Sequence, residues 1–397
     1  MEPVGTAATL SRRRFLASGA VGAAAVAVPG TIARAASASR SPRDLEGFIS
    51  SKMAEAGVPG LSACVVHGRR VVWARGFGWA NVHRGERVTT DTIFMLASIS
   101  KTVVATAVMQ AVERGLIDLE VDINDVLPFR VHNPAHPFTV ITPRMLLTHT
   151  AALRDNWSVL TPSYVRGDSS VPLETCLRDY FSARGGDYDP QRNFYPYPPG
   201  SRYNYCNMGV DVAAYLVEAV SGVPFDDWCD RKIFAPLGME RTGWHLADVP
   251  RTAVAMPYKY IAYRDAFRPF GQYGYPDYPD GELRTPSTDL ARHLMMIISG
   301  GGLGGVRLLQ ERTVREMLRP QFPDVVERQG IIWYPVQRTD DLYWGHTGGD
   351  WGVSTRCFFR QSDGTGIITL TNGTPVRHGW RALRDVEIRL FADADRL

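Results

Sequence analysis

The chain has 397 residues, of which 45% are hydrophobic and 21% charged, and its formal net charge is +3. Residues 1–38 hold four of the 44 basic residues and one of the 41 acidic residues, so the remainder carries 40 of each. A balance of this kind does not indicate nucleic acid or an anionic membrane surface as a partner. Residues 39–397 exceed the size of one typical core, which predicts two lobes.

The N-terminal segment has the features of a Tat export signal. Arg12, Arg13 and Arg14 precede a short Gly/Ala-rich stretch, and Ala33-Arg34-Ala35 has the A-x-A pattern of a cleavage site. The stretch is shorter than the ~20 residues that a spanning helix needs, which favours cleavage over an uncleaved membrane anchor. We predict that residues 1–38 are removed, that no stable membrane span remains, and that the protein is secreted or lies in the periplasm or cell envelope.

Cysteine usage gives no indication of a metal site or of a redox pair. An odd number of cysteines in an exported protein leaves at least one free thiol, and Tat cargo folds in the reducing cytosol, so we expect buried, unreactive thiols. There is no H-E-x-x-H motif and no paired Cys/His spacing, so we predict no metal and no other cofactor. The five cysteines are Cys64, Cys176, Cys206, Cys229 and Cys357.

The first predicted elements are a helix, a strand pair and a second helix. Residues 44–56 have the pattern of an amphipathic helix, and strand-like runs follow over 61–67 and 70–79, with Gly68 at the turn between them. A long apolar run then predicts a helix that begins near residue 98 and ends at Gly115.

The middle of the chain is predicted to be mainly helical, and the last third returns to strands. We expect one sheet built from both ends of the chain, residues 39–115 and 284–397, with residues 116–283 as an inserted helical lobe and the active site between the lobes. The clearest further helices are 144–150, 210–220, 288–299, 311–318 and 380–392, and the strand-like runs are 330–336, 342–347, 355–361 and 366–372.

One of the few lysines stands where arginine could not replace it. The chain has four lysines against 40 arginines, and only Lys101 has a serine, Ser98, three residues before it. Positions three apart near the start of a helix face the same way. A buried lysine can lose its proton and act as a base, whereas arginine stays protonated. S-x-x-K is therefore the pattern of a serine nucleophile with a lysine base.

This tetrad by itself is weak, because S-x-x-K also occurs by chance and a serine at a helix start is often an N-cap. Two further segments have the composition of a catalytic cleft. The first is Pro199-Gly200-Ser201-Arg202-Tyr203-Asn204-Tyr205-Cys206-Asn207, and the second is Gly345-His346-Thr347-Gly348-Gly349 on a late predicted strand.

With these three elements the chain resembles the serine β-lactamase and penicillin-binding-protein superfamily, in its D-alanyl-D-alanine carboxypeptidase, class C β-lactamase and family VIII esterase branch. That family is marked by S-x-x-K, then Y-x-N, then K/H-T-G, which here are Ser98/Lys101, Tyr205/Asn207 and His346-Thr347-Gly348. The resemblance covers essentially residues 39–397. It implies a β-lactamase/transpeptidase-like α/β (α+β) fold, with an antiparallel sheet flanked by helices.

The resemblance also implies roles for the site residues. Burial and the helix N-terminus should favour the neutral form of Lys101, and Tyr205 would relay protons between it and Ser98. The resemblance makes the backbone N–H groups of Ser98 and Gly349 the oxyanion hole. Asn207 would bind the substrate amide or ester, or cap the following helix, or both. Thr347 and Gly348 would flank the substrate beside His346, whose place is a lysine in many β-lactamases, which argues against strong β-lactamase activity.

Other candidates nearby are less informative. We expect His149 to be structural, because Thr148-His149-Thr150 ends a predicted helix, and Cys206 to be a bystander without a base of its own. Residues 258–278 carry eight aromatic side chains, which either line an apolar acyl pocket or pack as a surface loop.

The sequence thus predicts an exported serine hydrolase that cleaves a small ester or amide, or a D-amino-acid-containing peptide, through a Ser98 acyl-enzyme. The alternatives are a D,D-carboxypeptidase or β-lactamase using the same residues, an acyltransferase or peptide cyclase in which an amine or alcohol replaces water, and a non-catalytic relative.

Overall fold

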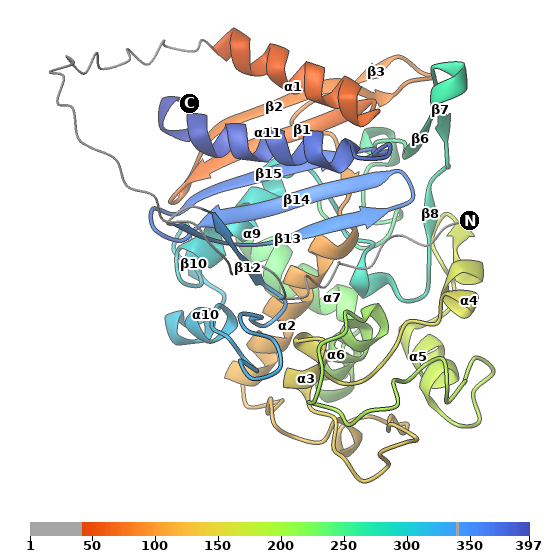
Figure 1. The fold of residues 1–397 in the computed structure, drawn as a ribbon. Helices are drawn as coiled ribbons and strands as arrows, with labels where there is room; N and C mark the ends of the chain where they lie inside the picture. Colours follow the sequence, from red (N-terminus) through yellow and green to blue (C-terminus); the bar gives the residue numbers. More distant parts are fainter. Residues whose placement is uncertain (1–41, 339–340) are drawn as a thin grey trace, which may run out of the picture. The chain divides into compact units, whose positions relative to one another are not determined.

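A computed structural model describes residues 42–338 and 341–397 of the chain (Figure 1). The predicted signal, residues 1–38, lies outside the described residues and stays a prediction. Residues 41–397 form one compact unit. Among the described residues no single helix is long and apolar enough to cross a membrane, although one bent pair, Asn207–Ser221 with Phe225–Leu237, has the length and composition to do so.

The predicted sheet from both chain ends is confirmed. It is antiparallel, with the strand order β12-β13-β14-β15-β1-β2-β3, so the first strands of the described chain lie directly beside its last ones. The strands are β1 (Gly60–His67), β2 (Arg70–Asn81), β3 (Glu86–Arg87), β12 (Tyr334–Arg338), β13 (Asp341–Asp350), β14 (Val353–Arg360) and β15 (Thr365–Thr371).

Helices cover both faces of this sheet. On one face α1 (Pro42–Ala56) and α11 (Gly379–Asp393) lie side by side (Figure 1) and share a core with Leu61, Ala63 and Val65 of β1. On the other face α9 (Ser287–Ile298) and α2 (Lys101–Glu113) share a larger core with Cys64 and Val66. Successive strand residues point to opposite faces of the sheet. β1 has apolar side chains on both faces, so it is buried along most of its length.

The segment between the two parts of the sheet is helical, as predicted, but it also contains short strands. Its helices are α3 (Pro143–Leu147), α4 (Trp157–Leu160), α5 (Leu173–Phe181), α6 (Asn207–Ser221), α7 (Phe225–Cys229) and α8 (Ala235–Leu237). Its strands are β5 (Val165–Arg166), β6 (Tyr258–Ile261), β7 (Ala266–Pro269) and β8 (Tyr273–Gly274), and β5 pairs with β8. The predicted division at residues 115 and 284 stays a prediction.

Two predicted elements begin or end elsewhere. The helix expected over 144–150 ends at Leu147, because His149 takes a left-handed backbone conformation with φ of 58°. The strand expected from residue 330 begins only at Tyr334, because Ile332 has φ of 63° and cannot continue a pleated strand. The other predicted helices and strands are found within a few residues of their expected bounds.

The remaining short strands are β4 (Phe94–Met95), β9 (Arg284–Thr285), β10 (Gly302–Leu303), β11 (Val306–Arg307) and β16 (Gly373–Thr374), and α10 spans Glu311–Met317.

The five cysteines are free thiols. Four of them are buried and Cys176 is partly buried. Burial raises the pKa of the Cys64 thiol to about 12, and burial likewise raises the pKa of Cys206. These thiols are protonated at neutral pH, which agrees with the expectation of unreactive cysteines.

Candidate active site

Ser98 and Lys101 stand together at the start of α2. Ser98 lies in a short 3₁₀ turn, η1 (Ala97–Ser100), and Lys101 is the first residue of the α-helix that continues it. Lys101 is fully buried, and its Nζ donates to Ser98 Oγ over 3.1 Å and to the carbonyl oxygen of Asp280 over 2.6 Å. Ala97 has φ of 49°, so the turn that presents the serine is held in a strained conformation. The pair is thus local in sequence and in direct contact.

The protonation of Lys101 differs from expectation. Burial alone lowers the pKa of its ammonium, but interactions with Tyr205, Asp280 and Asp211 raise that pKa by more, and the net direction is upward. The expectation that burial would leave this lysine neutral is therefore wrong for the free site. The reason is a set of acidic neighbours that the local sequence around residue 101 does not contain.

Tyr205 reaches the same pair from the helical segment. The Lys101 Nζ lies 5.3 Å from the centroid of the Tyr205 ring. Burial raises the pKa of the Tyr205 phenol, while the charge of Lys101 and hydrogen bonds with Ser98 and Lys101 lower it, with a net upward direction. The ring is nevertheless 38% exposed, so Tyr205 forms a wall of the site that solvent can reach. Both Lys101 and Tyr205 accordingly carry their protons at neutral pH.

His149 lies directly beside Tyr205, and the structural role that we expect for it stays a prediction. Its ring lies 4.3 Å from the ring of Tyr205, and its Nδ1 accepts the backbone N–H of Cys206 over 3.3 Å. Burial and the charge of Lys101 lower the pKa of His149 to about 3, so the ring is neutral with its proton on Nε2. The left-handed backbone that ends α3 turns this ring toward Tyr205. A histidine in the last turn of a predicted helix was the available signal.

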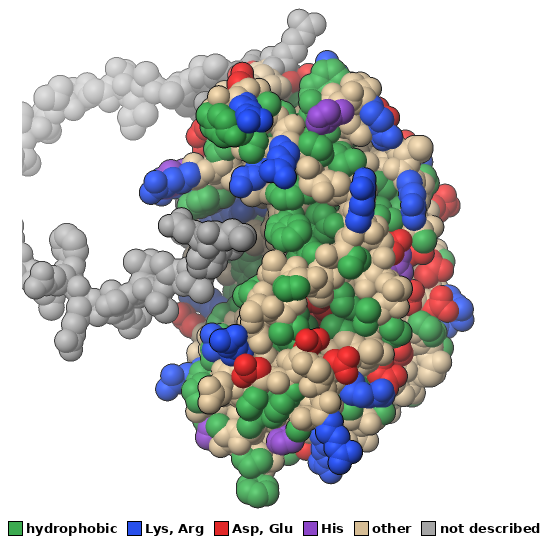
Figure 2. All heavy atoms as spheres, turned by 90° about the vertical axis from the view of Figure 1, so that its right-hand side faces the viewer, with side chains coloured by type: hydrophobic (Ala, Val, Ile, Leu, Met, Phe, Trp, Pro, Cys, Tyr) green, Lys and Arg blue, Asp and Glu red, His purple; other side chains and the backbone are tan. Residues whose placement is uncertain are grey.

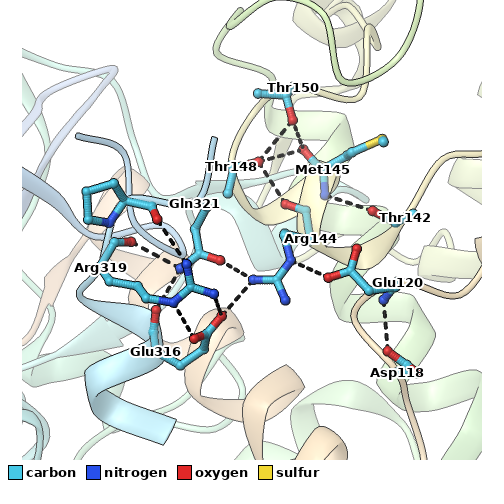
Figure 3. A network of polar contacts seen from close by, with 11 residues as sticks. Asp118, Glu120, Thr142, Arg144, Met145, Thr148, Thr150, Glu316, Arg319 and Gln321 are labelled. Atoms are coloured by element: carbon cyan, nitrogen blue, oxygen red, sulfur yellow. Dashed lines mark hydrogen bonds and ion pairs between the residues drawn. The ribbon is translucent and has the colours of Figure 1, made fainter. Parts of the chain in front are cut away.

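Figure 3 shows how the segment that carries His149 is anchored. Arg144 on α3 donates to Glu120 over 2.5 Å, to Glu316 over 2.7 Å and to the side chain of Gln321. Thr148 then donates its hydroxyl back to the carbonyl of Arg144 over 2.8 Å. This network ties the short helix to segments far away in the sequence and holds the turn that follows it.

Asp155 positions the Tyr205 loop, and the sequence analysis missed it. Its carboxylate accepts the backbone N–H groups of Asn207 over 2.9 Å and of Met208 over 3.1 Å, and the thiol of Cys206 over 3.3 Å. It therefore caps the N-terminus of α6, where those N–H groups have no helical partner. The interpretation of Asn207 as the cap of its own helix is wrong, because α6 begins at Asn207 and a remote carboxylate supplies the cap.

The third motif lies on β13. His346 is buried, its ring lies 6.3 Å from that of Tyr205, and its Nδ1 contacts the carbonyl oxygen of Thr347 at 2.7 Å. Burial and the charge of Lys101 lower the pKa of His346 to about 3, so it is neutral. Thr347 accepts the hydroxyl of Tyr334 over 3.1 Å. The edge strand of the sheet is β12, yet its pairing ends opposite Gly345, so within the described residues 346–350 have no strand partner on that side.

Gly348 brings β13 directly against the nucleophile segment. A Cβ at this position would lie 2.2 Å from the carbonyl oxygen of Leu96 and 3.1 Å from the backbone nitrogen of Ser98. Only glycine allows this approach. At Gly349, by contrast, a Cβ would meet nothing within 4 Å. The structure therefore brings Ser98, Lys101, Tyr205 and the His346–Gly349 strand into one place, while their roles stay predictions.

Two groups of side chains could hold a cation by geometry. The ligand atoms of Asp211, Asp277 and Asp280 lie within 4.8 Å of one another, and so do those of a second group, Asp168, His245 and Glu282. The first group lies beside Lys101, and two of its members contribute to the raised pKa of that lysine. Burial raises the pKa of Asp211 and Asp277 well above the usual range of a carboxyl and that of Asp280 to about 7, so the group carries only part of its possible negative charge beside the ammonium.

The aromatic side chains of the stretch 258–278 lie in different places, and the choice between an acyl pocket and a packed loop stays open. Tyr258 packs in the sheet side of the structure, bonded to Asn81, whereas Tyr273 and Tyr275 turn toward β13. A surface hollow of about 410 Å³ lies elsewhere, near the far end of α2, lined by Arg114 and Trp228 among others, and holds none of the motif residues.

Comparison with known proteins agrees with this geometry. The family model described as Beta-lactamase matches residues 45–388. The chain belongs to the beta-lactamase family. Members of this family are serine hydrolases, and so is this protein. The predicted family and fold are thereby confirmed.

Individual beta-lactamase-family relatives are distant. Penicillin-binding protein 4 of Amycolatopsis lactamdurans is 25% identical over 74% of this chain and 76% of its own length. Esterase EstB of Burkholderia gladioli is 29% identical over 53% of both chains. Among solved structures, a D-amino acid amidase from Ochrobactrum anthropi has a TM-score of 0.67 at 21% identity, covering 83% of this chain and 90% of its own. An octameric penicillin-binding protein homologue from Pyrococcus abyssi has a TM-score of 0.68 at 24% identity, covering 88% and 77%. At these identities the structures show the fold alone.

Proposed function

We propose that this protein is an exported serine hydrolase that cleaves a small ester or amide bond through an acyl-enzyme on Ser98. The observation that carries the proposal is the 3.1 Å contact between Lys101 Nζ and Ser98 Oγ inside a fully buried environment for the lysine. A nucleophile and a proton acceptor in direct contact are the minimum that acyl transfer to serine requires.

The proton must leave before the attack. The resting ammonium of Lys101 donates to Ser98, so the active form is the fraction in which Lys101 has lost its proton. In that form the amine takes the proton of Ser98 while Oγ attacks the carbonyl carbon. Tyr205 then gives its proton to the leaving group and regains one from Lys101. Water repeats the sequence in reverse and releases the acid.

Charge in the tetrahedral intermediate falls on the former carbonyl oxygen. Backbone N–H groups of Ser98 and Gly349 are the proposed donors, and the close approach that Gly348 permits between β13 and residues 96–98 supports this. Two such donors act strongly because they are fixed before the reaction begins.

The charges around the site favour substrates without a free carboxylate. His346 is neutral, so the site has no cation at the position where many β-lactamases have lysine. Asp350, at the end of the same strand, adds a further acidic group. A β-lactam carries a carboxylate, which Coulomb repulsion would disfavour here. Ester or amide hydrolysis is therefore proposed ahead of β-lactamase activity. A peptide ending in D-Ala-D-Ala carries a carboxylate too, but histidine at this position resembles the carboxypeptidases, so D,D-carboxypeptidase activity stays the alternative. The name of one relative, esterase EstB, is consistent with this order.

Labelling with a fluorophosphonate tests the central claim. Wild-type protein should be labelled and should release p-nitrophenol from p-nitrophenyl butyrate, and Ser98→Ala should do neither. Ser50→Ala, an exposed serine on α1, is the matched control and should behave as wild type. Equal labelling of Ser98→Ala and wild type would refute the proposal. Nitrocefin and an acyl-D-Ala-D-Ala peptide, assayed alongside, rank the alternatives, and an added amine or alcohol acceptor reveals acyl transfer.

A further inference from the structure

A carboxylate and a group of aromatic rings lie at the end of β13, the strand that contacts the nucleophile segment, without a part in the proton transfers above. The carboxylate is that of Asp350, the last residue of β13. Trp351 donates its backbone N–H to it over 2.7 Å, Tyr164 its hydroxyl over 3.3 Å and Tyr275 its hydroxyl over 3.3 Å. These are neutral donors, and two of them are long.

No positive charge balances this group. Within residues 42–338 and 341–397, no lysine, arginine or histidine is found in an ion pair with Asp350. The contrast with Glu387 is direct, since that buried carboxylate is paired with both Arg338 and Arg356. Burial raises the pKa of Asp350 to about 6, so it is still mostly ionised at pH 7. A partly buried carboxylate with only neutral donors gains from a cation that arrives with a ligand.

Asp350 lies on the face of β13 that meets the nucleophile segment. Side chains two apart on a strand share one face, so His346, Gly348 and Asp350 face the same way. At Gly348 that direction leads to the backbone nitrogen of Ser98, 3.1 Å from a Cβ built there. Tyr275 gives a second, independent link. A Cβ at Gly281 would lie 2.3 Å from its hydroxyl and 3.6 Å from Cα of Ala97, the residue before Ser98.

Aromatic rings wall this carboxylate on the open side. Tyr164 packs 4.4 Å from Trp351 and 4.7 Å from Tyr275, measured between ring centroids. Trp351 is 41% exposed, so the outer ring of this group faces solvent. Hydrophobic side chains gather on the face that carries β6 to β8, with Lys and Arg side chains nearby (Figure 2). Rings with electron-rich faces around a carboxylate are the surroundings that an organic ammonium group prefers.

We propose that Asp350, with Tyr164, Tyr275 and Trp351, binds a cationic amino group of the substrate, so that the enzyme prefers amino-bearing esters or amides such as those of amino acids. This rests on the proposed hydrolase function and adds its substrate class. The Asp350 carboxylate would form a charge-assisted hydrogen bond with the ammonium, and the rings would contact its hydrocarbon side.

The test compares two esters that differ in the amino group alone: phenylalanine methyl ester, as separate D and L enantiomers, and methyl 3-phenylpropionate. Wild-type kcat/KM should favour at least one amino ester by roughly 10- to 100-fold, the range of a hydrogen bond to a charged group. Asp350→Asn keeps the shape and the bond from Trp351 but removes the charge. It should reduce that preference to near unity, with a much smaller change for the neutral ester.

The matched control is Asp341→Asn at the opposite end of the same strand, where the carboxylate meets Ser362 instead. It should leave both rates unchanged. If Asp350→Asn keeps the wild-type preference, or lowers both esters by the same factor, the proposal is wrong.

A binding measurement separates this proposal from the hydrolase function. Calorimetry with 2-phenylethylammonium and with 2-phenylethanol requires no turnover. Tighter binding of the ammonium by wild type, lost in Asp350→Asn, supports the subsite even if no ester is cleaved. Equal affinity for the two compounds overturns it even if Ser98 proves to be the nucleophile.

Discussion

The two halves of the active site are assembled in different ways. Ser98 and Lys101 are three residues apart, and one turn of chain is enough to bring them into contact. Tyr205 arrives from a distant loop, and its position depends on His149 and Asp155, which belong to yet another segment. The first half could be recognised from the S-x-x-K motif in the sequence. The second half exists only where three segments pack together, so its supporting residues carry no local signature.

A substitution in the Ser98–Lys101 half of the site should have the largest effect on kcat. Lys101→Arg keeps a positive charge but cannot supply a neutral base, so we expect kcat to fall by about 10³- to 10⁴-fold, the contribution of a general base. Hydrolysis of p-nitrophenyl butyrate measures this, with Lys52→Arg as control, because arginine keeps the positive charge that pairs with Glu55 and Asp385. A Lys101→Arg enzyme that kept a tenth of the wild-type rate would mean that the lysine acts only through its charge.

The protonation state of the same half predicts a pH profile. The pKa of Lys101 is raised by acidic neighbours, and the reactive form is the deprotonated one. Below that pKa the active fraction grows about tenfold for each pH unit, so kcat/KM should still rise between pH 6 and pH 9, by up to about 10³-fold. A neutral ester should be used, so that substrate ionisation does not contribute. A plateau reached below pH 7 would show that the site lowers the lysine pKa instead.

A third prediction concerns the close contact between β13 and the nucleophile segment at Gly348. Ala at position 348 would place Cβ 2.2 Å from the Leu96 carbonyl oxygen, which is backbone and cannot swing away. Gly348→Ala should therefore push the strand from Ser98 and lower kcat by about 10²-fold, the value of one oxyanion-hole donor. Gly349→Ala, where a Cβ meets nothing within 4 Å, should lose much less. Equal losses in the two variants would contradict this account.

The smallest effect on kcat is expected for the half of the site that distant segments assemble around Tyr205. Asp155→Ala removes the cap of α6 and should cost about 1–2 kcal/mol of unfolding free energy. Because Tyr205 lies directly before that helix, kcat should also fall, by roughly tenfold. Asp189→Ala is the control: it removes a carboxylate that bonds two backbone N–H groups in a loop away from the site. It should lower stability without lowering kcat, and a loss of kcat there would point to a general effect of destabilisation.

The prediction that failed is as informative as those that held. The lysine was expected to be neutral because burial and a helix N-terminus both disfavour an ammonium ion. The structure surrounds it with Asp211, Asp280 and Tyr205, which reverse the direction of the pKa shift. Asp211 comes from α6 and Asp280 from the η7 turn (Tyr278–Asp280), so neither neighbour could be inferred from the residues around Lys101.

The sequence by itself determined the elements whose signals are local: the strands at both ends, the helix after Ser98, the order of the three motifs and the family that they mark. Hydrophobic periodicity and short motif spacing are properties of neighbouring residues, so they can be recognised in the sequence without knowledge of the fold. Only the tertiary structure decided the capping of α6 by Asp155, the place of His149 against Tyr205, the charge on Lys101 and the setting of Asp350 among Tyr164, Tyr275 and Trp351. Each of these depends on which distant segments share one small volume, and electrostatic interactions act through space, not along the chain.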